Sequence, residues 1–419
     1  MPDVATTPGI LFTAFEPSGD QVAAPVIARI RQAQPNLPIY AFGGAKMEAA
    51  GAAIIERTGQ HAVMLAGAVS QVGEHLTRLK RLKVWLREHA LNTLVPVDSP
   101  AANWSICKAV RKIQPKARIT HLVAPQLWAW APWRLGKLRR LTHHVLCLLP
   151  FEPDWFQSRG VKATFVGHPL YNQITPGGGE HGKPTGNRIN EVMGPLASHP
   201  GLKLALLPGS RAGEHFSNWP TMLRTFEVLS RKHPGLCGTV AAMNDEVVQR
   251  LAGIKPKGMK DAPQGQTDRE HGEPSWWPDS LHFRVGAVDE ILEWCDAVLV
   301  VSGTATLQTA IHEKPMVVLY NYKRWKWHTF ARYLIRTRTF AIPNLIAEAQ
   351  GQARAVKEFV PHFGRVEPIV EAVEELLTDK AANEKRVEAL KAINALFQPA
   401  VFAQRAADAI LALANLGPA

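Results

Sequence analysis

Two short turns in the second half of the chain carry residue types that suit the binding of phosphate. The turn 208–211 (Pro-Gly-Ser-Arg) follows the apolar run 204–207, and the turn 302–304 (Ser-Gly-Thr) follows the apolar run 297–301. A turn between a strand and a helix leaves the first N–H groups of that helix facing a ligand, and the helix dipole attracts phosphate. Two such turns predict a ligand with a diphosphate, such as a nucleotide sugar.

Arg211 is the most specific residue of these turns. Its guanidinium could bind a diphosphate through two parallel hydrogen bonds and stabilise it as it leaves. Glu214, three residues further on, either orients Arg211 or completes a capping box at the start of the helix. The predicted diphosphate site comprises Gly209, Ser210, Arg211, Glu214, Ser302, Gly303, Thr304, Ala305 and Thr306.

Asp98 is the best candidate for a catalytic base. It follows the strand-like run 93–97, which places it at the carboxyl edge of a parallel sheet, where ligands bind. Partial burial, with no cation adjacent in the sequence, predicts a raised pKa for Asp98, which suits the removal of a proton from an alcohol. The alternative is a helix N-cap, because the Asp-Ser-Pro sequence here is also a good helix start.

The first strand-to-helix turn of the chain holds a second group of polar residues. Glu16, Ser18, Gly19 and Asp20 follow the strand-like run 9–15. Their hydroxyl and backbone N–H groups could hold the phosphate or the sugar hydroxyls of an acceptor. Simple capping of the helix by Ser18 or Asp20 explains the same residues equally well, so both interpretations stay open.

Two segments, 128–140 and 322–338, combine tryptophans with lysines and arginines. Aromatic rings with interleaved cations suit a membrane interface, where the ring is half buried and the cation meets lipid phosphate. RNA binding by stacking, or core packing beneath a basic face, would use the same residues. No signature of an RNA-binding module accompanies them, so we favour a membrane surface or a lipid substrate and expect no nucleic acid.

The overall composition is that of a basic globular protein. The 419 residues carry a net charge of +12, and 46% of them are hydrophobic. The excess of positive charge fits an anionic partner. The sequence shows neither a signal peptide nor an apolar run long enough to span a bilayer. The four cysteines are far apart in sequence, which favours reduced buried thiols in the cytoplasm.

The sequence predicts no metal and no other cofactor. It contains no Asp-x-Asp motif and no cluster of histidines and cysteines. Arg211 and the helix dipoles could neutralise the leaving diphosphate in place of a metal ion.

Strand-like and helix-like segments alternate along the chain, which predicts an α/β fold with parallel sheets covered by helices. We expect an N-terminal Rossmann-like domain over 1–170, a linker over 171–200, and a second Rossmann-like domain over 201–365. A polar insertion interrupts the second domain at 255–279, and helices follow over 366–419. These last helices either return to the first domain or pack on a partner subunit of a homodimer. Two doubly wound domains would face each other across a ligand-binding cleft.

Short motifs spread from about residue 10 to about residue 360 resemble those of the lipid-A-disaccharide synthase family. The pieces in the first half are Glu16-Pro17-Ser18-Gly19-Asp20, Gly43-Gly44, Asp98-Ser99-Pro100 with Asn103, Trp128-Ala129-Trp130, Leu149-Pro150-Phe151-Glu152 and Gly167-His168. Those in the second half are Leu207-Pro208-Gly209-Ser210-Arg211 with Glu214, Ser302-Gly303-Thr304-Ala305, Pro315-Met316 and Pro343-Asn344-Leu345. Each piece is short, and their order and spacing together are specific.

The resemblance implies a GT-B fold and an inverting glycosyltransferase. The family joins UDP-2,3-diacylglucosamine to 2,3-diacylglucosamine 1-phosphate and releases UDP and the lipid A disaccharide 1-phosphate. By this resemblance Asp98 deprotonates the acceptor hydroxyl, Asn103 and the turn at 16–20 contact the acceptor, and Arg211 and the two turns hold UDP. The resemblance also implies a cytoplasmic protein that is peripheral to the inner membrane.

The sequence departs from the family pattern at a few positions of the implied site. Ala101 stands in place of an acidic residue, Gln308 in place of a ribose-binding glutamate, and Pro361 in place of a glutamine. Gln308 is therefore the last residue of the implied UDP site. These replacements motivate an alternative, a homologue that binds lipid or nucleotide with little or no turnover. A third hypothesis, a sugar-nucleotide epimerase on the same fold, rests only on the nucleotide-type half.

Overall fold

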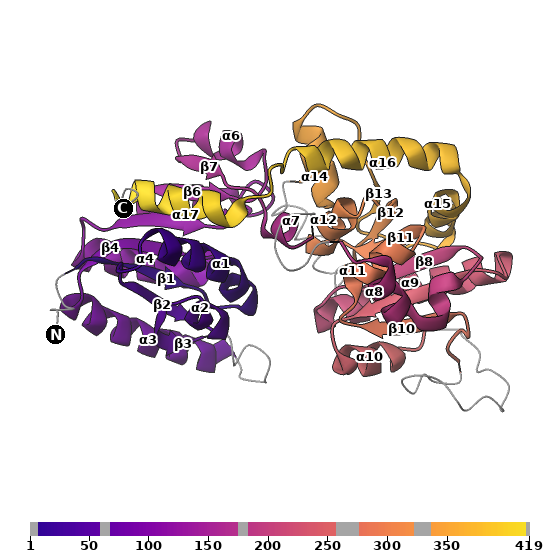
Figure 1. Ribbon diagram of the computed structural model, residues 1–419, viewed down its shortest axis with the longest axis horizontal. Helices are drawn as coiled ribbons and strands as arrows, with labels where there is room; N and C mark the ends of the chain where they lie inside the picture. Colours follow the sequence, from indigo (N-terminus) through magenta and orange to yellow (C-terminus); the bar gives the residue numbers. More distant parts are fainter. Residues whose placement is uncertain (1–6, 59–67, 175–182, 257–275, 322–336, 416–419) are drawn as a thin grey trace. The chain divides into compact units, whose positions relative to one another are not determined.

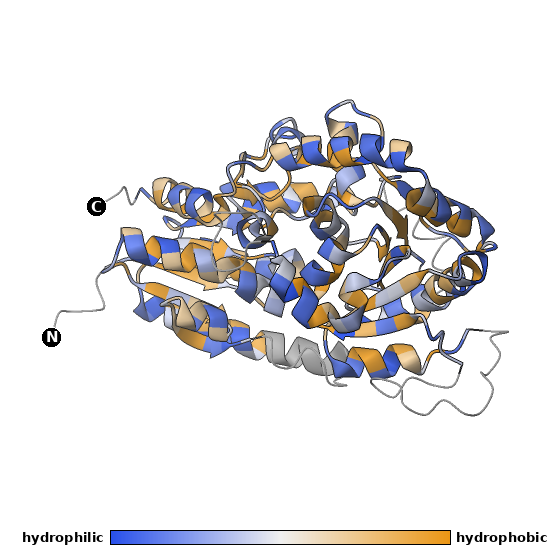
Figure 2. Cartoon of the chain, turned by 45° about the vertical axis from the view of Figure 1, so that its right-hand side comes forward, coloured by the Kyte–Doolittle hydropathy of each residue, from blue (hydrophilic) through white to orange (hydrophobic). Residues whose placement is uncertain are grey.

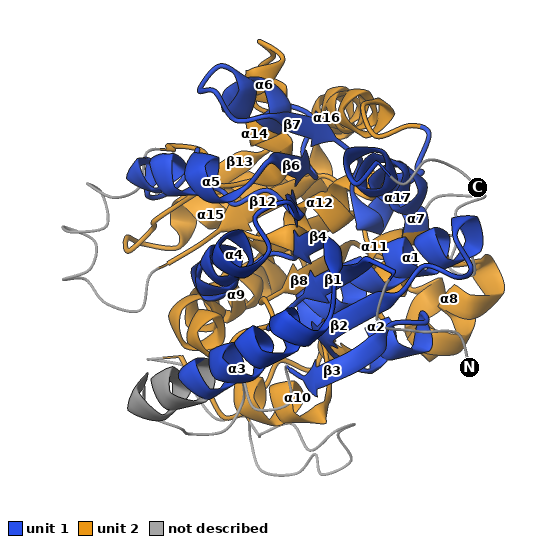
Figure 3. Cartoon of the chain, turned by 90° about the vertical axis from the view of Figure 1, so that its left-hand side faces the viewer, with its two compact units in different colours: residues 1–172, 399–419 blue, residues 173–398 orange. Residues whose placement is uncertain are grey.

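The computed structural model describes residues 7–58, 68–174, 183–256, 276–321 and 337–415 (Figure 1). The chain forms two compact units. Unit 1 consists of residues 1–172 with 399–419, and unit 2 of residues 173–398 (Figure 3). Each unit is built on one parallel sheet. None of the described helices has the length and apolar character needed to cross a membrane.

Unit 1 contains a seven-stranded parallel sheet in the order β3-β2-β1-β4-β5-β6-β7. Its strands are β1 (Gly9–Thr13), β2 (Ile39–Gly43), β3 (Ala53–Arg57), β4 (Leu91–Pro96), β5 (Arg118–Leu122), β6 (His144–Cys147) and β7 (Ala163–Phe165). Its helices are α1 (Pro17–Ala33), α2 (Ala45–Ala49), α3 (Ala68–Glu88), α4 (Pro100–Ile113), η1 (Pro132–Arg134), α5 (Leu135–Leu141), α6 (Glu152–Gln157), α7 (Pro169–Ile174) and α17 (Phe402–Leu413). Figure 1 labels most of these elements.

Helices cover both faces of this sheet, as the continuous apolar strands require. Alternate residues of β1 point to opposite faces: Ile10 and Phe12 pack with α1, α2 and α17, whereas Leu11 packs with α3 and α4. In Figure 2 the strands are mostly orange, and the helices carry orange and blue residues side by side. The first unit therefore has the doubly wound arrangement that the sequence predicted.

The last helix of the chain completes unit 1. Phe402, Ala406 and Ile410 of α17 are buried in the same core cluster as Val26 and Ile30 of α1. The sequence left two alternatives for the C-terminal helices, a return to the first domain or packing on a partner subunit. In the structure α17 returns to the first half of its own chain, while α15 and α16 belong to unit 2.

Unit 2 contains a six-stranded parallel sheet in the order β10-β9-β8-β11-β12-β13. Its strands are β8 (Lys203–Leu207), β9 (Cys237–Ala242), β10 (Leu281–Val285), β11 (Ala297–Val301), β12 (Met316–Leu319) and β13 (Lys357–Phe359). Its helices are α8 (Gly186–Met193), η2 (Gly194–Ser198), α9 (Ala212–Lys232), α10 (Asp245–Ala252), α11 (Val288–Trp294), α12 (Thr304–Ile311), α14 (Ile342–Ala349), α15 (Glu367–Thr378) and α16 (Lys380–Ala395). A large core cluster joins β8, β9 and β11 to α9, α10 and α15.

One sequence-based expectation of organisation differs from these elements. The segment 171–200, predicted to be a linker, contains α8 and η2, and the Thr185 side chain caps α8 by accepting a hydrogen bond from the N–H of Arg188. The Trp294 indole also donates to the carbonyl of Leu196, which fixes η2 to unit 2. Most of the polar insertion, 257–275, and most of the second aromatic-basic segment, 322–336, lie outside the described residues.

Candidate active site

In unit 1 the polar turns meet where the strand order reverses. Strands β1 and β4 are neighbours, while β2 lies on the other side of β1 and β5 on the other side of β4. The helices that follow β1 and β4 diverge at this point, and this leaves the crevice in which doubly wound folds bind ligands. The turns after β1 and β4 contain Glu16 and Asp98, and the Ser99 hydroxyl donates to the Glu16 carboxylate at 3.0 Å.

Asp98 and Ser99 have an unusual backbone. Their φ angles are +48° and +32°, in the left-handed region that non-glycine residues seldom adopt. The N–H of Asp98 donates to the carbonyl of Leu122 on β5 at 3.0 Å, which ties the turn to the next strand. Such conformations cost about 1–3 kcal/mol each and persist where the surroundings impose them. Asp98 is half-buried, and its turn is held in one fixed conformation at the edge of the sheet.

Asn103 holds this turn through side-chain hydrogen bonds. Its side-chain amide donates to the carbonyls of Asp98 at 3.0 Å and Val97 at 3.2 Å, and its oxygen accepts from the Thr13 hydroxyl at 2.6 Å. Asn103 and Thr13 are fully buried. The sequence resemblance implied that Asn103 contacts the acceptor. In the structure the side chain instead contacts the Asp98 turn from the protein interior. Its amide nitrogen and its amide oxygen are both already hydrogen-bonded to groups within unit 1.

The residues of the first turn have separate roles. Asp20 neither contacts the Asp98 turn nor caps its own helix; its carboxylate caps α2 by accepting from the N–H groups of Gly44, Lys46 and Met47. Gly19 is buried, and a Cβ there would lie 3.0 Å from the Cβ of Ala14. Both residues therefore hold the fold together. Glu16 and Ser18 are exposed and remain available to a ligand.

In unit 2 both phosphate-type turns lie at the equivalent point of the sheet. Strands β8 and β11 are neighbours, and the strand order reverses between them. Gly209 follows β8 with φ +91°, and Gly303 follows β11 with φ +153°. Only glycine adopts these conformations readily, so the two glycines allow the chain to turn directly into α9 and α12. The N-termini of both helices thus lie at one edge of one sheet.

Arg211 starts α9 with its side chain largely in solvent. The side chain is 79% exposed, and its Nη1 lies 3.5 Å from the Glu214 carboxylate. The same carboxylate accepts from the backbone N–H of Arg211 at 3.2 Å, as in a capping box. Both roles predicted for Glu214 therefore occur together. Burial raises the pKa of the neighbouring Tyr320, Glu214 raises it further, and Arg211 opposes the rise.

The hydroxyl groups of Ser302 and Thr306, at the turn after β11, donate hydrogen bonds to backbone carbonyls of unit 2. Ser302 donates to the carbonyl of Phe340 at 2.9 Å, and Thr306 donates to the carbonyl of Gly303 at 2.8 Å. Thr306 is fully buried and also accepts from the N–H of Ile342. These two side chains shape the start of α12. The exposed Gly303 and Thr304 are left at the surface of this turn, together with helix-start N–H groups that have no acceptor within the helix.

Gln308 belongs to a partly buried polar network between α11 and α12. Its amide donates to the carboxylate of Asp289 on α11 at 2.7 Å. The buried His312 contacts the same Asp289 oxygen at 3.0 Å and Glu293 at 2.7 Å. Burial lowers the pKa of His312, but the hydrogen bonds to the two carboxylates outweigh it and raise the pKa overall. An amide at position 308 can therefore donate a hydrogen bond to Asp289, whereas a carboxylate at this position would be repelled by the Asp289 carboxylate.

Glu152, a member of one of the sequence motifs, is a buried carboxyl group at the start of α6. Its carboxyl group accepts from the N–H groups of Leu148 and Leu149 and from the indole of Trp128 at 3.1 Å. Burial raises the pKa of Glu152 to about 7, while these hydrogen bonds oppose the rise. Glu152 thus anchors the aromatic-basic loop to the sheet.

Sequence reasoning also missed Thr13 and Asp289. Thr13 is the single polar residue that ends the apolar strand β1, and a polar residue at that place was a detectable signal. Asp289 gave no signal, because its partners Gln308 and His312 are on another helix. Among the described residues, no group of histidine, cysteine and carboxylate side chains could hold a metal ion.

The aromatic-basic segment 128–140 contains both packed and exposed tryptophans. Trp128 stacks edge-on against Phe151, whereas Trp130 and Trp133 are 46% and 62% exposed. The Arg134 guanidinium lies 4.6 Å from the ring centre of Trp130. The exposed part of this segment is thus amphipathic and rich in cations.

Two parallel, doubly wound units with helix N-termini at the strand ends define a GT-B fold. Solved structures with this fold match nearly the whole chain. The S. aureus MnaA–UDP structure matches with a TM-score of 0.63 and 11% identity, covering 98% of each chain. The glycotransferase of kitacinnamycin matches with a TM-score of 0.54 and 16% identity, covering 97% of this chain and 99% of that one. At these identities the likeness concerns the fold alone.

Sequence comparison gives the family. The lipid-A-disaccharide synthetase family model matches residues 10–271 and 278–412. The lipid-A-disaccharide synthase of Pseudomonas aeruginosa is 30% identical over 410 residues, which covers 96% of this chain and 97% of the relative. That of Myxococcus xanthus is 27% identical over 413 residues, with 97% of both chains covered. The chain belongs to the lipid-A-disaccharide synthase family, as its motifs predicted.

Proposed function

We propose that this protein is an active glycosyltransferase that joins UDP-2,3-diacylglucosamine to 2,3-diacylglucosamine 1-phosphate. Family membership over nearly the whole chain is the observation that carries this proposal. It is supported by the arrangement of residues at both strand-order reversals. The replacements at positions 101, 308 and 361 leave Asp98 and Arg211 in place.

Asp98 is proposed as the general base. Its carboxylate takes the proton of the acceptor hydroxyl, the hydroxyl oxygen forms a bond to C1 of the donor sugar, and the bond from C1 to the UDP oxygen breaks. Attack from the side opposite the leaving group inverts C1. The support for this role is the fixed conformation of the Asp98 turn, because a general base must be held close to the proton that it removes.

Unit 2 is proposed to hold UDP. The N-termini of α9 and α12 lie at one sheet edge and would meet the diphosphate with N–H groups and dipoles. The exposed Arg211 side chain can move onto the diphosphate and stabilise the charge that develops as UDP leaves. Helix dipoles and one guanidinium then do the work that a metal ion performs in other transferases.

We further propose that the protein is peripheral to the cytoplasmic face of a membrane, where its acylated substrates reside. The exposed Trp130 and Trp133, with Arg134 beside them, form the proposed contact. Such rings insert at the level of the lipid headgroups, and the cations attract anionic lipid.

The test is turnover with purified protein. Both acylated substrates are supplied in mixed micelles without added metal, UDP release is followed continuously, and the disaccharide is identified by mass spectrometry. The proposal expects stoichiometric UDP and disaccharide in the presence of both substrates only. UDP binding measured by calorimetry, with no disaccharide formed, would instead establish a binding protein derived from the enzyme.

A further inference from the structure

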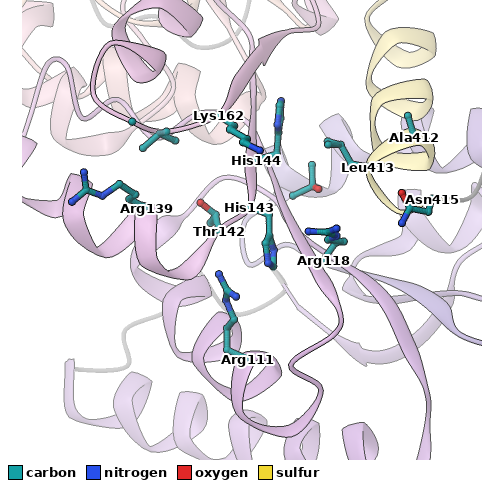
Figure 4. Close-up of a pocket in the computed structure, with 13 residues that line it drawn as sticks. Arg111, Arg118, Arg139, Thr142, His143, His144, Lys162, Ala412, Leu413 and Asn415 are labelled. Atoms are coloured by element: carbon teal, nitrogen blue, oxygen red, sulfur yellow. The ribbon is translucent and has the colours of Figure 1, made fainter.

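A cavity in the described part of unit 1 lies apart from the proposed active site. It has a volume of about 500 Å³ and is lined by residues of α4, β5, α5, β6, α17 and the loop before β7 (Figure 4). Arg118 is the first residue of β5, His144 the first of β6, and Lys162 directly precedes β7. The cavity therefore lies at the amino ends of the strands, whereas Asp98 lies at their carboxyl edge.

The lining of this cavity is strongly cationic. Arg111, Arg118, Arg139 and Lys162 contribute four positive charges, and no carboxylate lines the space. Within the described residues, none of the four forms a salt bridge. Figure 4 shows these side chains arranged around His143 and His144. Arg118, Arg139 and Lys162 are exposed, so solvent screens part of the repulsion among these charges, and a bound anion would remove what remains.

Helix dipoles account for only part of this arrangement. Arg111 lies in the last turn of α4 and Arg139 in the last turn of α5, where a cation is normally favourable. Arg118 and Lys162 are at the starts of strands and have no such role. These two residues nevertheless line the same cavity as the two helical arginines, although the four come from segments far apart in the sequence. Helix dipoles alone therefore do not explain why four cations gather here.

The cavity also contains buried polar groups without partners. Thr120 is fully buried and lines the space, and its hydroxyl has no hydrogen-bond partner. The Nε of Arg111 and the Nδ1 of His144 are likewise buried and unpartnered. Buried polar groups are normally hydrogen-bonded, so three unpartnered groups in the wall of one cavity favour a polar occupant over an apolar one. The Nε of Arg111 and the hydroxyl of Thr120 are donors, and the Nδ1 of His144 is one in the tautomer in which its Nε2 accepts from the Thr164 hydroxyl.

The two histidines are adapted to this setting. The Nδ1 of His143 accepts from the N–H of Ile119 at 2.8 Å, so a neutral His143 carries its proton on Nε2 and donates from there. Burial lowers the pKa of His143, and Arg111 and Arg118 lower it further. Burial and Lys162 lower the pKa of His144 in the same way. Burial, with the surrounding cations, thus disfavours the charged form of both rings.

We propose that this cavity is a binding site for a phosphate group, distinct from the UDP site of unit 2. Guanidinium groups bind phosphate bidentately, and Arg118 on β5 and Lys162 just before β7 would contact it from the two sides of β6. The volume exceeds that of phosphate alone and admits a group esterified to it, such as glycerol. The phosphate is supplied either by a soluble phosphomonoester or by a lipid headgroup.

The test compares two double variants with the same loss of charge. Arg118→Gln with Lys162→Gln removes the site, whereas Arg29→Gln with Lys80→Gln removes one exposed arginine and one exposed lysine elsewhere in unit 1. Binding of inorganic phosphate and glycerol 1-phosphate is measured by calorimetry at fixed ionic strength. UDP binding of each variant serves as the check that the protein is folded and that unit 2 is intact.

We expect saturable binding of glycerol 1-phosphate that falls roughly 100-fold in the site variant, as two charge-assisted contacts are lost, and stays unchanged in the control. A second arm measures co-sedimentation with phosphatidylcholine vesicles containing phosphatidic acid. A loss of vesicle binding in the site variant alone identifies a lipid headgroup as the source, and unchanged vesicle binding identifies a soluble ester. Equal binding by both variants in both arms, or no saturable binding by the unaltered protein, overturns the proposal.

Discussion

Asn103→Ala should impair catalysis without touching substrate, because Asn103 holds the Asp98 turn. The substitution removes the donor to the carbonyls of Asp98 and Val97 and the acceptor for the Thr13 hydroxyl. Each buried polar group left without a partner costs about 1–3 kcal/mol, and some of these groups will shift to find another partner. We therefore expect the free energy of unfolding to fall by roughly 2–4 kcal/mol.

The effect on rate follows from the backbone of the turn. Without Asn103, Asp98 and Ser99 can leave the left-handed region, which costs about 1–3 kcal/mol per residue to maintain. A displacement of the base by about 1 Å lowers the rate of the chemical step roughly 100-fold. UDP affinity should not change, because the proposed UDP site is in unit 2.

The assay measures UDP release at saturating substrates and, in parallel, chemical denaturation followed by circular dichroism. Thr13→Val is the matched control, since it removes one hydrogen bond to Asn103 and keeps the bonds to the turn. It should cost about 1 kcal/mol of stability and change the rate by less than about threefold. A turnover of Asn103→Ala equal to that of Thr13→Val would refute the role assigned to Asn103.

Three further predictions concern single residues. Arg211→Lys keeps the charge but loses the planar fork, so UDP affinity measured by calorimetry should fall about tenfold; unchanged affinity would place Arg211 outside the diphosphate site. Gly303→Ala should lower the free energy of unfolding by about 1–3 kcal/mol and weaken UDP binding, because a residue with a Cβ is strained at a φ of +153°. Steric overlap is not the cause, since nothing lies within 4 Å of the new Cβ. Gly136→Ala in α5, equally unobstructed but with ordinary φ, should be neutral or stabilising. Burial raises the pKa of Glu152 from 4.5 to about 7, so its stabilising contribution is present below pH 4.5 and is lost as the pH rises to about 7. The stability advantage of the unaltered protein over Glu152→Gln, followed by denaturation at several pH values, should therefore shrink by roughly 3 kcal/mol across that range, and a constant difference would contradict the burial argument.

Much of the fold could be predicted from the sequence because its central strands are apolar on both faces. Runs such as 297–301 have no other plausible place than the middle of a parallel sheet. Once two strands are neighbours, the turns at their carboxyl ends meet, and this placed the turns 208–211 and 302–304 at one edge. The edge strand β3 was not predicted, since its residues are half-buried or exposed and form no comparable apolar run.

The parts of the site that sequence missed depend on contacts between distant segments. Asp20 was expected to contact an acceptor or to cap its own helix, and its actual partners are N–H groups 24 to 27 residues away at the start of α2. The cationic cavity of unit 1 likewise draws its charges from separate helices and strands. No local pattern reports such convergence, because it arises only when the strands are ordered in the sheet.

The most direct test of the account is the turnover of Asp98→Asn, a nearly isosteric change that removes the base and keeps the turn. Single-turnover rates with both acylated substrates are compared with UDP affinity in the same preparation. The account predicts a rate lowered by at least about 100-fold with UDP affinity unchanged, since general-base catalysis contributes roughly 100- to 10,000-fold. A variant that transfers the sugar at nearly the original rate would show that Asp98 is not the base.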